Sequence, residues 1–378
     1  MFDGWAILAL GIAYIGVLFA IAWTGDRTIR SRKGGEGRPL IYALSLGVYC
    51  TSWTFFGSVG LAASTGYDFI PVYIGPILMF VFGWPLILRI IRLSKSQNIT
   101  SVADFLAARY GKSQAVAAVV TIVAVVGTLP YIALQLKAVV ISTEALLNGN
   151  SQLPEEWTEV IGFGETALVA AIALAAFAVL FGTRHIDATE HQDGLMLAVS
   201  AESLVKLAAF LTVGIFVVVS VFGGIGGFAE RLADNPELRA TFVRPFNGGV
   251  WLTVSFLSFV CIILLPRQFH VTVVENNSER EVHRARWLFP LYLVLINIFV
   301  VPVAAAGLLE FPDRSVDADL FVLSLPISRD NNLITTVAYI GGLSAATAMV
   351  IVESIALAIM VCNGLVIPLL LRQRLLEA

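Results

Sequence analysis

Charged side chains are scarce in this chain: Asp, Glu, Lys and Arg make up 13% of its 378 residues, about half the share found in soluble domains. Cysteine is also rare, and Cys50, Cys261 and Cys362 all lie within apolar runs. That placement argues against a disulfide framework and a thiolate metal centre. The sequence shows no nucleotide-binding glycine motif, no basic patch with interleaved aromatic residues and no polar stretch long enough to form a soluble domain. We therefore expect no catalytic residues, no cofactor and no nucleic-acid partner.

Apolar residues dominate instead, at 58% of the chain with a mean hydropathy of +0.85. They form runs close to the roughly 20 residues that a helix needs to cross a bilayer. The runs are Gly4 to Trp23, Ile41 to Ala63, Phe69 to Ile91, Ala115 to Ser142, Thr166 to Phe181, Leu204 to Gly223, Val250 to Leu265, Trp287 to Leu308 and Leu333 to Leu371. These runs predict an all-α, polytopic membrane protein with about nine transmembrane helices.

Lys and Arg are concentrated in the loops that are cytoplasmic if the amino terminus lies outside, which is the distribution of the positive-inside rule. The opposite loops are acidic. We therefore expect a multi-pass protein of a bacterial inner membrane with its amino terminus outside. The charged stretches Arg267 to His270 and Arg280 to Arg286 are predicted to lie in a cytoplasmic loop that anchors span ends. The histidines lack ligand spacing and are all expected in cytoplasmic loops, so no metal site is predicted: His185, His191, His270 and His283.

The second run is unusual for a membrane span because Ile41 to Ser64 carries no charge yet is dense in hydroxyls and glycines. A helix that faces lipid gains nothing from such residues, whereas a helix interrupted at mid-bilayer exposes backbone carbonyls and needs small residues there. The sequence therefore predicts a broken helix that lines a solute site. A tightly packed interhelical face is the alternative, since small residues also let helices approach closely.

Two further segments have local signals. Ser101 to Tyr110 begins with a capping serine and has Asp104 three residues later, which predicts a short amphipathic helix on the cytoplasmic surface. The last run, Leu333 to Leu371, is too long for one perpendicular crossing, so part of it must tilt, break or project. Gly341 and Gly342 are the predicted break points.

Four motifs carry a resemblance to a known family: Tyr49 to Gly57, Ser101 to Gly111, Leu129 to Lys137 and Leu265 to Val271. The chain resembles the sodium:solute symporter family. It is most similar to the symporter-like membrane domain at the front of certain bacterial hybrid sensor histidine kinases. The resemblance covers nearly the whole chain and depends on the order and spacing of the motifs together.

The resemblance implies one symporter-like transmembrane domain over residues 1–378, with a leucine-transporter-like fold of two five-helix inverted repeats. Residues 1–38 would form an extra helix and basic loop, residues 41–223 the first repeat and residues 250–378 a partial second repeat. Counted this way, the second repeat is two helices short at Ala378. We expect a fragment, or the front of a longer polypeptide whose cytoplasmic kinase domains are its partners.

Ionisable residues inside the spans are the clearest chemical signal, since a charge at mid-bilayer costs about 3 kcal/mol on insertion scales. Glu202 and Lys206 lie one helical turn apart, so they are either a mutually compensating pair or part of an ion path. Glu353 has no such neighbour. We expect it to have a function, because intramembrane acids mark ion and proton paths.

In the family, a sodium ion is held by backbone carbonyls of the first core helix and two hydroxyls of the eighth. By motif, the carbonyls correspond to Gly47 and Cys50, and the hydroxyl pair to Glu353 and Ser354, of which only one is a hydroxyl. Lys206 on the fifth core helix would point to the same place, where its ammonium can replace the ion. We hypothesise that Lys206 and Glu353 form a titratable pair in a sodium-like site. Transport would then be proton-coupled or uncoupled, with sodium coupling as the family alternative.

The resemblance places a small organic solute, such as an amino acid, on the broken part of the first core helix and on core helices three and six. The residues concerned are Ser52, Trp53, Gly57, Tyr131, Gln135, Trp251 and Ser255. Two of them have simpler interpretations: Trp251 as an anchor at the outer interface, and Tyr131 as a cap of the kink at Pro130. The expected function is a solute:cation symporter-like domain that senses the solute for a histidine kinase. A stand-alone secondary transporter and a receptor that does not transport are the alternatives.

Overall fold

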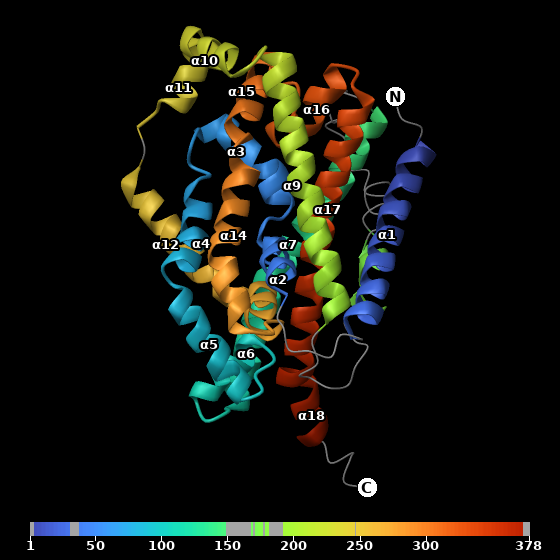
Figure 1. Cartoon of the computed structure of the whole chain (residues 1–378), viewed down its shortest axis with the longest axis vertical. Coiled ribbons are helices and arrows are strands. Elements are labelled where there is room, and N and C mark those ends of the chain that lie inside the picture. Colours follow the sequence, from blue (N-terminus) through green and yellow to red (C-terminus); the bar gives the residue numbers. More distant parts are fainter. Residues whose placement is uncertain are drawn as a thin grey trace.

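The computed structural model describes residues 4–30, 38–148, 192–245 and 247–372, with a further short stretch within 168–180. In this part of the chain every regular element is helical, and the helices form one elongated bundle (Figure 1). The predicted fifth span, Thr166 to Phe181, is described only in part, with a short apolar helix at Ala171–Leu180. His185 and His191 lie outside the described residues. The all-α prediction is confirmed for the described residues.

The first half of the bundle contains two bent spans between straight helices. Its elements are α1 (Gly4–Arg30), α2 (Pro39–Ser45), η1 (Leu46–Tyr49), η2 (Trp53–Gly57), α3 (Ser58–Thr65), α4 (Pro71–Val81), α5 (Trp84–Ser96), α6 (Val102–Arg109), α7 (Gln114–Asn148), α9 (Asp193–Phe216) and η3 (Val217–Val221). The chain turns by 69° between η1 and η2, and by 69° again between α4 and α5. The short helix α6 begins as predicted, since the Ser101 side chain accepts a hydrogen bond from the amide of Asp104.

The break in the second span is the one expected from its composition. Cys50 has an extended backbone, with φ −81° and ψ 99°, so no helical hydrogen bonds continue through it. The hydroxyl residues Ser45, Thr51, Ser52 and Ser58 are all less than 3% exposed. Residues 45–58 therefore face the interior of the bundle and not the lipid.

The second half repeats the pattern of a broken span followed by straight helices. Its elements are α10 (Ile225–Asp234), α11 (Pro236–Phe242), α12 (Gly248–Leu264), α13 (Pro266–Phe269), η4 (His270–Val274), α14 (Glu279–Asn297), α15 (Val300–Glu310), η5 (Ala318–Leu320), α16 (Phe321–Ser328), α17 (Asn332–Val361), η6 (Cys362–Val366) and α18 (Ile367–Arg372). The axis bends by 56° between α12 and α13. Each half thus contains at least one broken span, which is a feature of inverted-repeat transporters.

The break after α12 corrects the prediction that Arg267 to His270 lie in a cytoplasmic loop. Leu265 is extended, with ψ 132°, because the following Pro266 disfavours a helical conformation at the residue before it. The helix then resumes, and Arg267 and His270 are only 3% exposed. The span continues past the proline, so these charged and polar residues lie inside the bundle.

The predicted break at Gly341 and Gly342 is wrong, because α17 runs through both residues without interruption. A Cβ atom at Gly342 would lie 2.3 Å from Cζ of Phe56, and one at Gly341 would lie 2.7 Å from Cζ of Phe55. The two glycines therefore make room for aromatic rings of η2. The excess length of this span is accommodated instead by α18, which projects beyond the other helices at the end of the bundle that carries α6 (Figure 1).

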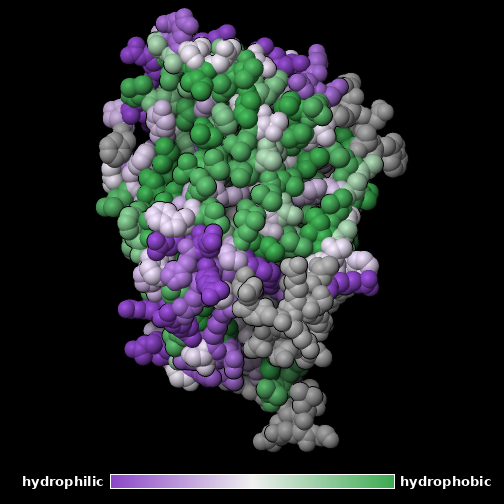
Figure 2. All heavy atoms as spheres, in the orientation of Figure 1, coloured by the Kyte–Doolittle hydropathy of each residue, from purple (hydrophilic) through white to green (hydrophobic). Residues whose placement is uncertain are grey.

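The surface has the distribution of a membrane protein. Five helices among the described residues are long and apolar enough to cross a bilayer, and eight spans result if each bent pair counts as one. Figure 2 shows a broad hydrophobic zone across the middle of one face, with hydrophilic residues gathered at both ends. Large apolar side chains such as Val123, Phe256 and Leu291 are more than half exposed. The chain is a multi-pass membrane protein.

Candidate functional site

The unwound residues between η1 and η2 are held by α7. The Gln135 side-chain oxygen accepts hydrogen bonds from the Ser52 amide at 3.0 Å and from the Ser52 hydroxyl at 2.7 Å. The Tyr131 and Thr51 hydroxyls lie 2.7 Å apart. The structure thus brings together three of the predicted solute residues, Ser52, Tyr131 and Gln135. The contact with Thr51 gives Tyr131 a partner outside its own helix, beyond any role at the Pro130 kink.

Lys206 of α9 donates hydrogen bonds from its ammonium to the two carbonyls that the resemblance assigns to sodium. Its Nζ lies 2.8 Å from the Cys50 oxygen and 3.3 Å from the Gly47 oxygen, and the residue is fully buried. A Cβ at Gly47 would lie only 2.7 Å from Oγ of Ser203, so the glycine allows η1 to approach α9 closely. An ammonium ion that belongs to the protein therefore occupies the position predicted for a cation at the break.

Glu202 is the nearest carboxylate along the helix to Lys206, but its hydrogen bonds go to α17. Its carboxylate accepts from the Thr347 hydroxyl, and its backbone carbonyl accepts from the Ser344 hydroxyl at 2.7 Å. Glu202 is 1% exposed. The two residues, one helical turn apart on α9, therefore bind different neighbours: Glu202 binds α17, and Lys206 binds the broken helix.

Glu353 pairs with Arg267, which corrects the predicted pairing with Lys206. Nη1 of Arg267 lies 2.8 Å from Oε2 of Glu353, and the two side chains are 4% and 0% exposed. The guanidinium carbon also lies 5.2 Å from the centre of the Tyr131 ring, within the range of a cation–π contact. The pair joins α13 to α17 beside the break in the second span.

The remaining predicted residues are placed differently. Trp251 donates from its indole nitrogen to Asp68 at 2.8 Å. It lies fourteen residues before Leu265, about 20 Å along the helix at ~1.5 Å per residue. Ser255 is ten residues before the same break, and its carbonyl lies 2.5 Å from where a Cβ of Gly75 would be. The structure therefore does not bring these two residues of α12 to the Ser52 region.

Trp53 and Gly57 lie within η2 and contact each other. A Cβ at Gly57 would lie 2.8 Å from Cδ1 of Trp53, so the indole covers the glycine. Ser354 follows Glu353 on α17 and is half-buried.

Arg267 and Gln268 were not predicted to belong to the site. Gln268 is fully buried, and its amide nitrogen and oxygen have no hydrogen-bond partner among the described residues. The sequence did contain a usable signal, because apolar residues recur after Pro266, at Phe269, Val271, Val273 and Val274. A charged residue that follows a proline within a continuing apolar run indicates a broken span, whereas a true loop would lose its apolar character.

The end of the bundle that carries α6 is closed around α2. The Tyr42 hydroxyl donates to the Thr272 carbonyl at 2.8 Å, and the Arg38 amide donates to Glu281 at 2.6 Å. The Arg38 side chain also pairs with Asp193 at the start of α9. These contacts fix the first half of the broken helix to α9, α14 and η4.

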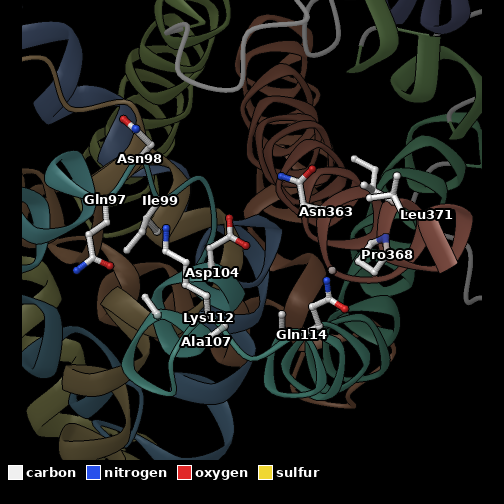
Figure 3. Close-up of a pocket in the computed structure, with 14 residues that line it drawn as sticks. Gln97, Asn98, Ile99, Asp104, Ala107, Lys112, Gln114, Asn363, Pro368 and Leu371 are labelled. Atoms are coloured by element: carbon white, nitrogen blue, oxygen red, sulfur yellow. The ribbon is translucent and has the colours of Figure 1, made fainter. Parts of the chain in front are cut away.

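A separate cavity of about 330 Å³ lies at this same end, between α6 and α18. Figure 3 shows Asp104 and Lys112 on one side of the cavity and Asn363 and Pro368 on the other. It lies where α17 gives way to the wide turn η6. The cavity is distinct from the site at the broken helices.

Known proteins that resemble the chain are symporters. No family model matches it. It is 22% identical to the uncharacterized symporter YhjB of Bacillus subtilis over 331 residues, which is 84% of this chain and 63% of that protein. It is 23% identical to the uncharacterized symporter YodF of the same organism over 297 residues, 69% of this chain and 58% of that protein. The chain thus spans less than two thirds of the length of either relative.

A solved structure matches almost the entire chain. It shows a Na⁺-coupled sialic acid symporter in a substrate-bound, outward-open state. The TM-score is 0.64 and the identity 14%, and the match covers 95% of this chain and 73% of the symporter. By fold, the chain is a leucine-transporter-like helix bundle of the kind found in a sodium-coupled symporter.

Proposed function

We propose that this chain binds a small organic solute at the break between η1 and η2 and carries it across a bacterial inner membrane, with the amino terminus outside. The polar groups gathered there support the proposal. Ser52, Tyr131 and Gln135 surround unwound backbone that lies within the bundle. Such discontinuous helices form the solute sites of inverted-repeat transporters.

The observation that carries the proposal is the pair of hydrogen bonds from Lys206 to the carbonyls of Gly47 and Cys50. Carbonyl oxygens exposed by a broken helix need a cation or a donor, because nothing else in a bilayer can satisfy them. Here the ammonium of Lys206 supplies both the charge and the donors. We therefore propose that no sodium ion is needed at this position, and that transport is proton-coupled or uncoupled.

Proton coupling would involve Lys206 and Glu202, since Glu353 is engaged by Arg267. We propose that opening towards the cytoplasm moves α2 and η1 away from α9, which separates the two carbonyls from the ammonium. A proton bound at Lys206 therefore favours the arrangement in which its ammonium binds the two carbonyls and the cytoplasmic side is closed. Loss of that proton weakens the two hydrogen bonds and favours opening.

Uptake into proteoliposomes that contain the full-length protein tests this function. A mixture of radiolabelled L-amino acids serves as the probe, under an imposed sodium gradient or an imposed pH gradient. We expect uptake without sodium, as accumulation under the pH gradient if transport is proton-coupled and as equilibration if it is uncoupled, and loss of any accumulation in Lys206→Met. Uptake that depends on external sodium and survives collapse of the proton gradient would contradict the assignment of Lys206.

We also propose that the membrane domain is the sensory front of a histidine kinase, with residues 41–223 as its first repeat and residues 250–378 as a partial second repeat. The motifs shared with such kinases support this, while the names of the matched relatives favour a stand-alone transporter. Sequence that follows Ala378 in the parent gene separates these possibilities, because a kinase must encode signalling domains after the membrane part. Solute binding without uptake in the proteoliposomes would indicate the third possibility, a receptor that does not transport.

A further inference from the structure

The ion pair between Arg267 and Glu353 has one hydrogen bond, which leaves other polar atoms of both side chains without a partner among the described residues. One contact joins Nη1 of Arg267 to Oε2 of Glu353 at 2.8 Å. Nε of Arg267 and Oε1 of Glu353 are buried and have no hydrogen-bond partner among the described residues. A guanidinium and a carboxylate normally pair through two parallel hydrogen bonds when nothing else competes for them. The pair thus retains one buried donor and one buried acceptor.

The unpartnered atoms Nε of Arg267 and Oε1 of Glu353 lie next to the proposed solute site. Arg267 lies against the ring of Tyr131, at 5.2 Å from its centre, and the Tyr131 hydroxyl contacts Thr51 in the unwound segment. Gln268, the next residue of α13, adds an amide whose nitrogen and oxygen are also buried without partners. Several unsatisfied polar atoms therefore occur on one short helix beside the break. Buried polar groups in proteins are nearly always paired, so such a cluster indicates a ligand.

The charge balance of the interior limits what that ligand can be. Beside the broken helices, Lys206 and Arg267 are buried together with Glu202 and Glu353. The other buried acids have partners of their own: Glu275 lies 3.4 Å from His270, and Glu281 accepts from backbone amides. A ligand with a net charge would disturb this balance in a medium where an unpaired charge is expensive. A neutral molecule with one anionic and one cationic group preserves it. Such a molecule also offers an acceptor to Nε of Arg267 and a donor to Oε1 of Glu353.

We propose that the solute is a small zwitterion whose carboxylate is bound by Arg267 and whose ammonium is bound by Glu353. This inference rests on the proposed function, because it names the class of solute for the same site. It also changes the role expected for Glu353, from ion coupling to solute binding. The carboxylate would lie against Tyr131, with the rest of the solute towards Ser52 and Gln135.

Binding measurements on the purified full-length protein test the inference. The ligands are the proteinogenic L-amino acids, the α-amide of each, which lacks the carboxylate charge, and a set of neutral sugars. Thermal stabilisation as a function of ligand concentration yields an apparent affinity. We expect at least one amino acid to bind, and its amide to bind about 10- to 100-fold more weakly, as for loss of a charge-assisted hydrogen bond.

The variants separate recognition from folding. Arg267→Gln alone leaves Glu353 unpaired and is prone to misfold. The double variant Arg267→Gln with Glu353→Gln keeps neutral partners of nearly the same shape and removes both charges. We expect it to fold and to lose amino-acid binding by a similar factor. Arg92→Gln, which breaks an exposed ion pair with Glu279, is the matched control and should bind as the wild type does.

Each outcome decides a different point. Equal binding of acid and amide, or wild-type affinity of the double variant for the acid, overturns the zwitterion proposal while solute binding stands. Thermal stabilisation by sugars alone also overturns the zwitterion proposal while solute binding stands. Failure of every ligand class to bind the folded wild type overturns the proposed function, and the inference with it.

Discussion

Replacement of Lys206 by alanine should convert the protein into one that responds to sodium. The substitution removes the donor to the carbonyls of Gly47 and Cys50, and each unsatisfied buried acceptor costs about 1–3 kcal/mol. The free energy of unfolding should therefore fall by about 2–6 kcal/mol. The charge of Glu202, left without Lys206 nearby, should lower it further. Sodium bound between the exposed carbonyls would recover part of this, since a ligand at 100 times its Kd stabilises by about 2.7 kcal/mol.

The assay is thermal unfolding of purified protein in sodium chloride and in choline chloride at the same ionic strength. Wild type should unfold at the same temperature in both salts, whereas Lys206→Ala should unfold at a lower temperature in choline and regain part of the difference in sodium. Lys206→Met is the control, because its side chain fills the space but donates no hydrogen bond. It should be destabilised in both salts. Equal sodium responses in wild type and Lys206→Ala would refute the reasoning.

Three further predictions concern the packing and the polar contacts. Arg267→Gln or Glu353→Gln alone should lower the free energy of unfolding by about 3–5 kcal/mol, and the double variant by less than the sum, as measured by denaturant titration in mixed micelles. Gly342→Ala should cost about 1–3 kcal/mol by overpacking against Phe56, and adding Phe56→Leu should restore most of the loss; no recovery would show that the glycine has another role. Ser101→Ala should cost about 1 kcal/mol through loss of the helix cap, seen as faster amide hydrogen exchange confined to the first turn of α6; unchanged exchange there would contradict it.

The broken second span was predictable because its composition conflicts with its surroundings. Hydroxyls and glycines within a charge-free apolar run have no use against lipid, and Ser45, Thr51, Ser52 and Ser58 prove to be buried. The cap of α6 was predictable for a different reason. It depends on groups three residues apart, so local sequence contains all the information required.

The partners of the buried charges were not predictable in this way. Arg267 and Glu353 are separated by 86 positions, and helical spacing relates only residues three or four apart. The sequence suggested Lys206 as the partner because the family resemblance directs both residues to the same sodium site. The break at Pro266 turns α13 inward, and this bend brings the guanidinium to α17.

The sequence by itself determined that the chain crosses a membrane many times, that one span is interrupted and that ionisable groups lie within the spans. These properties follow from composition and local spacing, because a bilayer penalises each unsatisfied polar group wherever it occurs along the chain. The tertiary structure decided which of these groups meet. It placed Lys206 on the exposed carbonyls and Arg267 on Glu353, and it used Gly341 and Gly342 to admit aromatic rings where a kink was expected. Such pairings depend on how helices distant in sequence are oriented against one another, which side-chain spacing along a single helix does not specify.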